Sequence, residues 1–197
     1  MNPTVQNNVK NILIAGVGGQ GTLLASKLMG KCFIGEGYDV KVSEVHGMSQ
    51  RGGSVVTYVR YGDKVHSSLI EKGEADLVLA FEQLEAARWL PYLKPGGVLI
   101  ANTQRIDSMP VIMGKAVYPE DILDKIRDKG VEVVAVDALS LALEAGSVKC
   151  VNVVLLGVAA RYLGLEPDVW LEILRTAVPP RTVAMNEQAF RLGYDAR

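Results

Sequence analysis

The stretch "NILIAGVGGQGTLLASKLMG", residues 11–30, joins a buried-strand pattern to a glycine turn and a helix pattern. An apolar run at 12–15 precedes the turn at 16–21, and apolar residues recur at helical spacing after it. A continuous apolar run is typical of a parallel strand that helices cover on both faces. The stretch therefore predicts the first strand–turn–helix unit of a Rossmann-like α/β fold.

Strand and helix patterns alternate through most of the remaining sequence. We expect further strands at residues 38–42, 54–61, 77–80, 98–101 and 131–136. We expect the last helices near residues 138–145, 150–163, 167–177 and 181–193. This order predicts a mostly parallel sheet with helices on both faces and a helical C-terminal portion. No linker divides the chain, so we expect one domain over 1–197, with a sheet core at about 10–136 and a helical part at about 137–197.

Composition excludes several classes of function. The formal net charge is −1 and aromatic residues make up 6%, so no nucleic-acid surface is indicated. The N-terminal residues are polar, and no apolar run approaches the ~20 residues of a membrane span. Cys32 and Cys150 stand alone, so we expect two buried, reduced thiols and neither a zinc nor an iron–sulfur site. These features are typical of a cytoplasmic protein that contacts neither nucleic acid nor membrane.

The glycine spacing G-x-G-x-x-G has more than one interpretation. Gly16 permits a tight turn, Gly18 permits a close approach, and the N-terminus of the next helix attracts anions. A dinucleotide site also needs an acid ~20 residues further on, and Glu44 lies 23 residues after Gly21. However, Glu44 leads into a polar loop and not into a crossover helix, which fits NAD poorly. A dinucleotide site, a general anion-binding turn and a purely structural turn all remain open.

A second unusual loop lies in "SEVHGMSQRGGSVV", residues 43–56. It gathers His46, Gln50 and Arg51 between glycines, at the end of a strand where α/β proteins carry ligands. The guanidinium of Arg51 offers a fork of donors that suits a carboxylate or a phosphate. A solvated loop with one salt-bridged arginine is the alternative. The clustering favours a ligand-binding or subunit-contact surface.

Motifs for independent catalysis are absent from the sequence. There is no G-x-S-x-G, no H-E-x-x-H, no P-loop lysine and no thiamine-diphosphate signature. We expect the acids at helical spacings to lie on solvated faces; these are Glu82, Glu85, Asp121 and Asp124. We therefore assign no catalytic residue and no metal ligand, and infer a subunit that completes the active site of another chain.

The residues quoted so far are specific enough to indicate a family. "GVGGQGTLLASKLMG" (16–30) and the run from "SEVHGMSQRGG" to "KPGGVLIAN" (43–102) resemble the small (beta) subunit of indolepyruvate:ferredoxin oxidoreductases. That subunit is similar to the gamma subunit or domain of 2-oxoacid:ferredoxin oxidoreductases. The resemblance implies a heteromeric enzyme that decarboxylates an aryl pyruvate oxidatively with coenzyme A, giving an arylacetyl-CoA, carbon dioxide and reduced ferredoxin. Thiamine diphosphate and iron–sulfur clusters would lie on a large partner subunit, and ferredoxin would interact with the enzyme through that subunit.

The resemblance also implies where this chain meets the shared site. An anion- or coenzyme A-facing turn would comprise Gly16, Gly18, Gly19, Gln20, Gly21 and Thr22. A loop facing the partner's active site would comprise Glu44, His46, Gln50, Arg51, Gly52 and Gly53. The chain would bind no cofactor of its own, and the isolated chain could self-associate through its uncovered partner surface. The alternatives are a stand-alone NAD- or FAD-dependent oxidoreductase, a gamma subunit for another 2-oxo acid, and a nucleotide-sensing or assembly module.

Overall fold

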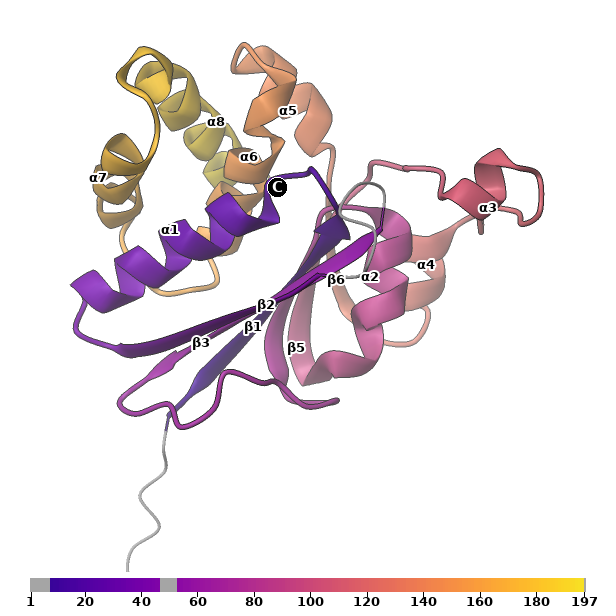
Figure 1. Ribbon diagram of the computed structural model, residues 1–197, viewed down its shortest axis with the longest axis horizontal. Helices are drawn as coiled ribbons and strands as arrows, with labels where there is room; N and C mark the ends of the chain where they lie inside the picture. Colours follow the sequence, from indigo (N-terminus) through magenta and orange to yellow (C-terminus); the bar gives the residue numbers. More distant parts are fainter. Residues whose placement is uncertain (1–7, 47–52, 197) are drawn as a thin grey trace, which may run out of the picture.

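A six-stranded sheet with helices on both faces forms the body of the protein (Figure 1). The computed structural model describes residues 8–46 and 53–196. The strands are β1 (Lys10–Val17), β2 (Asp39–His46), β3 (Ser54–Gly62), β4 (Ala75–Ala80), β5 (Leu93–Asn102) and β6 (Glu132–Val136). The helices are α1 (Thr22–Gly35), α2 (Gln83–Trp89), α3 (Met109–Ile112), α4 (Ile122–Arg127), α5 (Ala138–Glu144), α6 (Val151–Ala160), α7 (Pro167–Ala177) and α8 (Val183–Asp195). Short 3₁₀ turns are η1 (Leu90–Tyr92), η2 (Val148–Cys150) and η3 (Pro180–Thr182).

The strand order is β2-β3-β1-β4-β5-β6, and only β3 runs against the others. The pairs β1–β4, β4–β5 and β5–β6 are parallel, which confirms the predicted mostly parallel sheet. β3 pairs with β1 along its length, from Lys10↔Tyr61 to Val17↔Ser54. β3 is therefore inserted between β1 and β2, so that β2 is the strand at one edge of the sheet.

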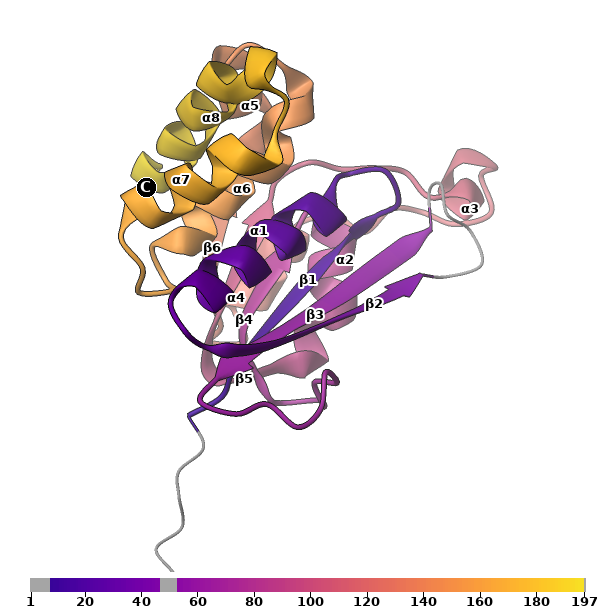
Figure 2. The same cartoon turned by 60° about the vertical axis from the view of Figure 1, so that its left-hand side comes forward.

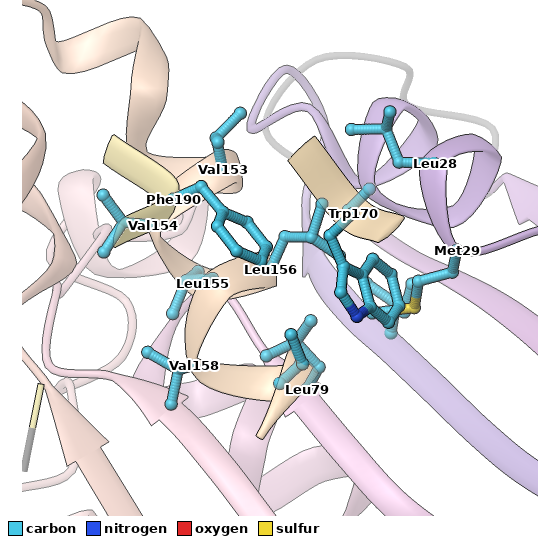
Figure 3. Close-up of a cluster of buried hydrophobic side chains, with 14 of the residues drawn as sticks. Leu28, Met29, Leu79, Val153, Val154, Leu155, Leu156, Val158, Trp170 and Phe190 are labelled. Carbon is cyan, nitrogen blue, oxygen red and sulfur yellow. The ribbon is translucent and has the colours of Figure 1, made fainter. Parts of the chain in front are cut away.

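Two layers of helices cover the sheet, as Figures 1 and 2 show from two sides. On one face α1 packs with α5 to α8, and on the other face α2 and α4 pack against β4, β5 and β6. All ten residues of α6 are buried, because this helix lies inside the helical layer. Its side chains meet Trp170 of α7, Phe190 of α8 and Leu79 of β4 in one apolar cluster (Figure 3). The helical C-terminal portion thus shares its core with the sheet.

Two glycines let α6 and α8 approach until their backbones touch. A Cβ on Gly157 would lie 2.1 Å from the carbonyl oxygen of Phe190. A Cβ on Gly193 would lie 2.0 Å from the carbonyl oxygen of Val154. No side chain larger than hydrogen fits at either position without moving the helices apart.

The two cysteines are buried free thiols, as the sequence predicts. Burial, together with nearby Glu36, raises the pKa of Cys32 to about 12. Within residues 8–46 and 53–196, no helix has the length and apolarity to cross a membrane.

Candidate ligand site at the carboxyl ends of the strands

The glycine turn after β1 and the start of β3 lie side by side. The amide of Gly18 donates a hydrogen bond to the carbonyl oxygen of Gly53 (2.9 Å). This contact follows from the antiparallel register, because Val17 at the end of β1 faces Ser54 at the start of β3. The amide of Gly18 is therefore already used within the protein, although a dinucleotide site would turn such an amide toward a phosphate.

The strand order also separates Glu44 from the glycine turn. Glu44 lies on β2 opposite Thr57 of β3, so a whole strand stands between it and β1. In dinucleotide-binding folds, the ribose-binding acid lies on the strand next to the first one. Two strand spacings amount to about 10 Å, and this distance argues against a standard NAD or FAD site.

Part of the second predicted loop lies outside the described residues. Gln50, Arg51 and Gly52 belong to that part, while His46 is the last residue of β2. Among the described residues of this loop, Gly53 contacts the glycine turn.

Each glycine of the turn has a structural reason to lack a side chain. A Cβ on Gly16 would lie 3.0–3.1 Å from atoms of Gln20, Thr22 and Phe81. Gly19 and Gly21 have φ angles of +102° and +83°, which disfavour other residues. The turn is thus tightly constrained before any ligand is considered.

Gln20 braces the turn from inside, a role that the sequence analysis did not predict. Its Oε1 accepts a hydrogen bond from the amide of Val17 (2.7 Å), and its Nε2 donates to the carbonyl oxygen of Phe81 (3.0 Å). Both ends of the amide side chain are used to hold the end of β1 to the end of β4. This geometry favours a supporting role for Gln20 over direct contact with a ligand.

Asn102 extends this bracing, and the sequence analysis did not single it out. It is fully buried at the end of β5, where Nδ2 donates to the carbonyl oxygen of Phe81 (3.2 Å) and to Oε1 of Gln104 (3.3 Å). Its Oδ1 accepts from the amide of Ala138 at the start of α5 (3.2 Å). An asparagine directly after a buried apolar run was the available signal, because buried amides need several partners.

A cavity of about 380 Å³ opens beside the glycine turn. Its polar lining comprises Gly19, Gln20, Gly21, Gln104, Lys149 and Asn152, and its apolar lining comprises Ile106, Leu139, Val148 and Val151. Gly21 is the N-cap of α1 and provides no capping side chain, so the positive end of this helix faces the turn. Because Lys149 also lines this cavity, the cavity suits a ligand that has an anionic part and an apolar part.

The expectation that Glu82 and Glu85 lie on a solvated face is wrong. Their exposed fractions are 1% and 4%. Glu82 is the N-cap of α2, and its Oε2 accepts from the amides of Leu84 (2.7 Å) and Glu85 (3.0 Å). Because α2 begins directly at the end of a buried strand, its first acid turns inward and satisfies backbone donors.

The other oxygen of Glu82 fixes a neighbouring segment. Oε1 accepts hydrogen bonds from the amide of Ile106 (3.1 Å) and from the hydroxyl of Tyr118. Burial and this hydrogen bond raise the pKa of Tyr118. One carboxylate therefore holds both ends of the segment between β5 and α4.

Glu85 ties α2 to the start of β3. Its Oε2 accepts from Oγ of Ser54 (2.5 Å) and from Nε1 of Trp89 (3.2 Å), and its Oε1 accepts from Nε of Arg88 (3.1 Å). A second cavity of about 330 Å³ lies here, and Ser54, Glu82, Glu85 and Arg88 are part of its lining.

Asp121 and Asp124 are exposed, as predicted.

Metal ligation was not expected of this chain. In the part of the chain that the structure describes, no three histidine, cysteine, aspartate or glutamate residues lie close enough together to hold a metal ion.

Comparison with known proteins gives a consistent family. Residues 11–196 match the family described as pyruvate ferredoxin/flavodoxin oxidoreductase. The indolepyruvate oxidoreductase subunit IorB of Thermococcus kodakarensis is 46% identical over 191 residues, which cover 94% of this chain and 95% of that protein. The subunit of the same name from Pyrococcus horikoshii is 45% identical over the same shares.

Solved structures share the fold at lower sequence identity. The gamma subunit of a keto/oxoacid ferredoxin oxidoreductase from Geobacter sulfurreducens superposes with a TM-score of 0.72 at 23% identity, over 95% of this chain and 97% of that chain. A 2-oxoglutarate:ferredoxin oxidoreductase from Magnetococcus marinus gives a TM-score of 0.73 at 20% identity, over 94% of this chain and 30% of that chain. The match to nearly the whole sequence and the relatives above 40% identity confirm the predicted resemblance: this chain belongs to the pyruvate ferredoxin/flavodoxin oxidoreductase family, as a subunit of the 2-oxoacid:ferredoxin oxidoreductase type.

Proposed function

We propose that the chain is the accessory subunit of a thiamine-diphosphate-dependent indolepyruvate:ferredoxin oxidoreductase. The complex would convert an aryl pyruvate and coenzyme A to an arylacetyl-CoA and carbon dioxide, and would reduce ferredoxin. The observation that carries the proposal is the 46% identity to an indolepyruvate oxidoreductase subunit over 94% of the chain. The gamma subunit shared by pyruvate and ketoisovalerate oxidoreductases of the same organism is 28% identical over 83% of the chain, and this difference favours indolepyruvate over those substrates.

Within the complex, this chain would contribute binding and positioning, and the cofactors of the large subunit would supply the carbanion and electron-transfer chemistry. The cavity beside the glycine turn would receive part of coenzyme A. The phosphates of coenzyme A would lie near the N-terminus of α1 and Lys149. The less polar parts of coenzyme A would lie along Val148 and Val151. The segment from Glu44 to Gly53, with Arg51, would face the partner's active site.

The test is co-expression of the chain with a large subunit of an indolepyruvate oxidoreductase. We expect a stable complex that reduces ferredoxin or a viologen dye only when an aryl pyruvate and coenzyme A are both present. Pyruvate, 2-oxoglutarate and 2-ketoisovalerate serve as comparison substrates. Absence of a complex, together with micromolar NADH binding by the isolated chain, would contradict the proposal and favour a stand-alone oxidoreductase.

The coenzyme A site has a separate test in the same complex. Lys149→Ala should raise the KM for coenzyme A by about tenfold with little change in the KM for the oxo acid, because one charge-assisted contact is lost. Lys129→Ala is the matched control, since Lys129 lines a cavity that the glycine turn does not border. An equal change in both variants would contradict the assignment of the cavity.

A further inference from the structure

An arm of residues 105–117 projects from the end of β5 before the chain returns to α4. Its root is fixed, because Glu82 accepts hydrogen bonds from Ile106 at one side and from Tyr118 at the other. The guanidinium of Arg105 lies 4.4 Å from the centre of the Tyr118 ring and pairs with Asp107 (2.7 Å). The arm is therefore held at its base in a defined position.

The outer part of the arm is apolar and exposed. The exposed fractions are 60% for Met109, 66% for Ile112, 54% for Met113 and 88% for Val117. No charged residue occurs from Ser108 to Gly114. Figures 1 and 2 show α3 standing clear of the other helices in both views. Single exposed apolar residues are ordinary, but a gathering of four on one projection marks an interaction site.

The arm also borders the candidate site. Ile106 lines both cavities, and Asp107, Ser108 and Pro110 line the second one. Further exposed apolar side chains lie at the same end of the sheet, where the parallel strands have their carboxyl ends. These are Leu23 in the first turn of α1, Val45 near the end of β2, and Val148 in the cavity lining. Exposed apolar side chains therefore lie both on the arm and on neighbouring elements at the carboxyl ends of the strands.

We propose that the arm anchors the large subunit, which docks over the carboxyl ends of the parallel strands of this chain. This inference rests on the proposed function, because it takes the cofactor-bearing large subunit as the occupant. A specific interface buries ~800 Å² on each partner, whereas the largest apolar patch of a monomer covers a few hundred Å². The arm alone is too small for such an interface, so we expect the interface to include the exposed apolar side chains at the same ends of the strands as well.

The comparison with the Magnetococcus protein supports the same occupant. The fold shared with this chain covers only 30% of that longer chain, so there the domain is joined covalently to the rest of its polypeptide. The IorB relatives match this chain over 95% of their own length, so in them the domain is a separate polypeptide that must hold a partner by surface contact. An apolar arm with a rigid base provides this contact next to the site that the partner would complete.

The test measures the dissociation constant between this chain and the large subunit. The arm variant carries Ile112→Asp and Met113→Asp, and we expect it to raise the Kd at least about tenfold. The control variant carries Ile34→Asp and Leu69→Asp, two residues of similar exposure at the opposite edge of the sheet, and should leave the Kd unchanged. Unchanged thermal midpoints of the isolated variants show that both remain folded.

The outcomes separate this proposal from the proposed function. A wild-type chain that binds no large subunit overturns the proposed function. A wild-type complex whose Kd is the same with the arm variant overturns the role of the arm alone. Light scattering provides the last distinction: if the isolated wild-type chain is a dimer, and the arm variant is a monomer that still binds the large subunit normally, then the arm binds a second copy and the proposal is overturned.

Discussion

Gly19 and Gly21 share a positive φ but differ in what surrounds them. A Cβ on Gly19 would meet nothing within 4 Å, whereas a Cβ on Gly21 would lie 2.6 Å from Nδ2 of Asn152. We expect Gly19→Ala to lower the free energy of unfolding by about 1 kcal/mol through backbone strain alone. Gly21→Ala should lower it by about 1–2 kcal/mol more, because the strain and the contact with Asn152 add. Urea denaturation of the two variants measures the difference.

A third variant identifies the cause of that difference. Adding Asn152→Ala to Gly21→Ala removes the neighbour and should recover most of the extra loss. Equal destabilisation by the two glycine variants would show that Asn152 moves aside freely and does not constrain the turn.

Asp137 provides a prediction about pH. Its Oδ1 accepts from the amide of Ser140 (3.0 Å) and its Oδ2 from the hydroxyl of Ser140 (2.6 Å), and the side-chain bond and then the backbone bond lower the pKa of Asp137 below 3.8. A lowered pKa stabilises the fold above the ordinary pKa, and this contribution is lost as pH falls through the folded-state pKa.

Asp137→Ala should therefore cost about 1 kcal/mol at pH 7, as expected for loss of an N-cap, and progressively less below pH ~4. Denaturation midpoints between pH 7 and pH 3 check this trend. Asp63→Ala, which removes an exposed loop carboxylate, should follow the wild type at each pH. A deficit for Asp137→Ala that does not change with pH would exclude the charge as its cause.

At the scale of single residues, the sequence predicts a tight glycine turn, and the positive φ values of Gly19 and Gly21 agree with such a turn. Of the four acids expected on solvated faces, Asp121 and Asp124 are exposed. The burial of Glu82 and Glu85 was not predicted, because the spacing in a short helix cannot tell which of its faces another segment will cover. The partners of Glu82, Ile106 and Tyr118, are more than 20 residues away in the sequence.

Among the elements, the α6–α8 pair depends most directly on single residues. Gly157→Ala would place a methyl group against the backbone of α8, so the helices must separate. We expect a loss of about 3 kcal/mol or more in the free energy of unfolding. Gly35→Ala is the matched control, because this α1 residue has open space around it, and the change should be neutral or slightly stabilising. Thermal or urea unfolding compares the two, and similar values would mean that α6 and α8 adjust readily.

Element positions could be predicted from the sequence, but strand order could not. Every predicted strand is present within a few residues, and the four C-terminal helices lie where expected. The insertion of β3 between β1 and β2 was not foreseen, because periodicity identifies a strand but not its neighbours. β5 also begins earlier than expected: the sequence predicts a strand at 98–101, but Pro95, Gly96 and Gly97 already lie in it, next to an irregularity in its pairing with β4.

For the whole molecule, formation of the complex should protect one edge and not the other. If the large subunit covers the carboxyl edge, amide hydrogen exchange across residues 109–117 should slow at least about tenfold in the complex. Exchange across residues 63–74, which follow β3 and lie at the amino ends of the parallel strands, should not change. Hydrogen-exchange mass spectrometry of the free and bound chain measures both segments. Slower exchange across residues 63–74 alone would place the partner at the amino ends of the parallel strands and contradict the prediction.

The arm shows why this surface could not be predicted from the sequence. Met109, Ile112 and Met113 resemble core residues in the sequence, and only the tertiary structure shows that they are exposed among the residues that it describes. The family, in contrast, follows from two contiguous motifs, and for that reason the resemblance was sufficient to identify it.

The inserted position of β3 also bears on the order in which the chain can fold during synthesis. β2 pairs with β3, and β3 pairs with β1, and these three strands are all complete once Gly62 has been made. A small sheet can therefore close before β4 exists. β4, β5 and β6 then add in chain order, each parallel to the one before it, on the open edge of β1. No strand made later has to insert between strands that are already paired, so growth of the sheet can follow translation from β1 outward.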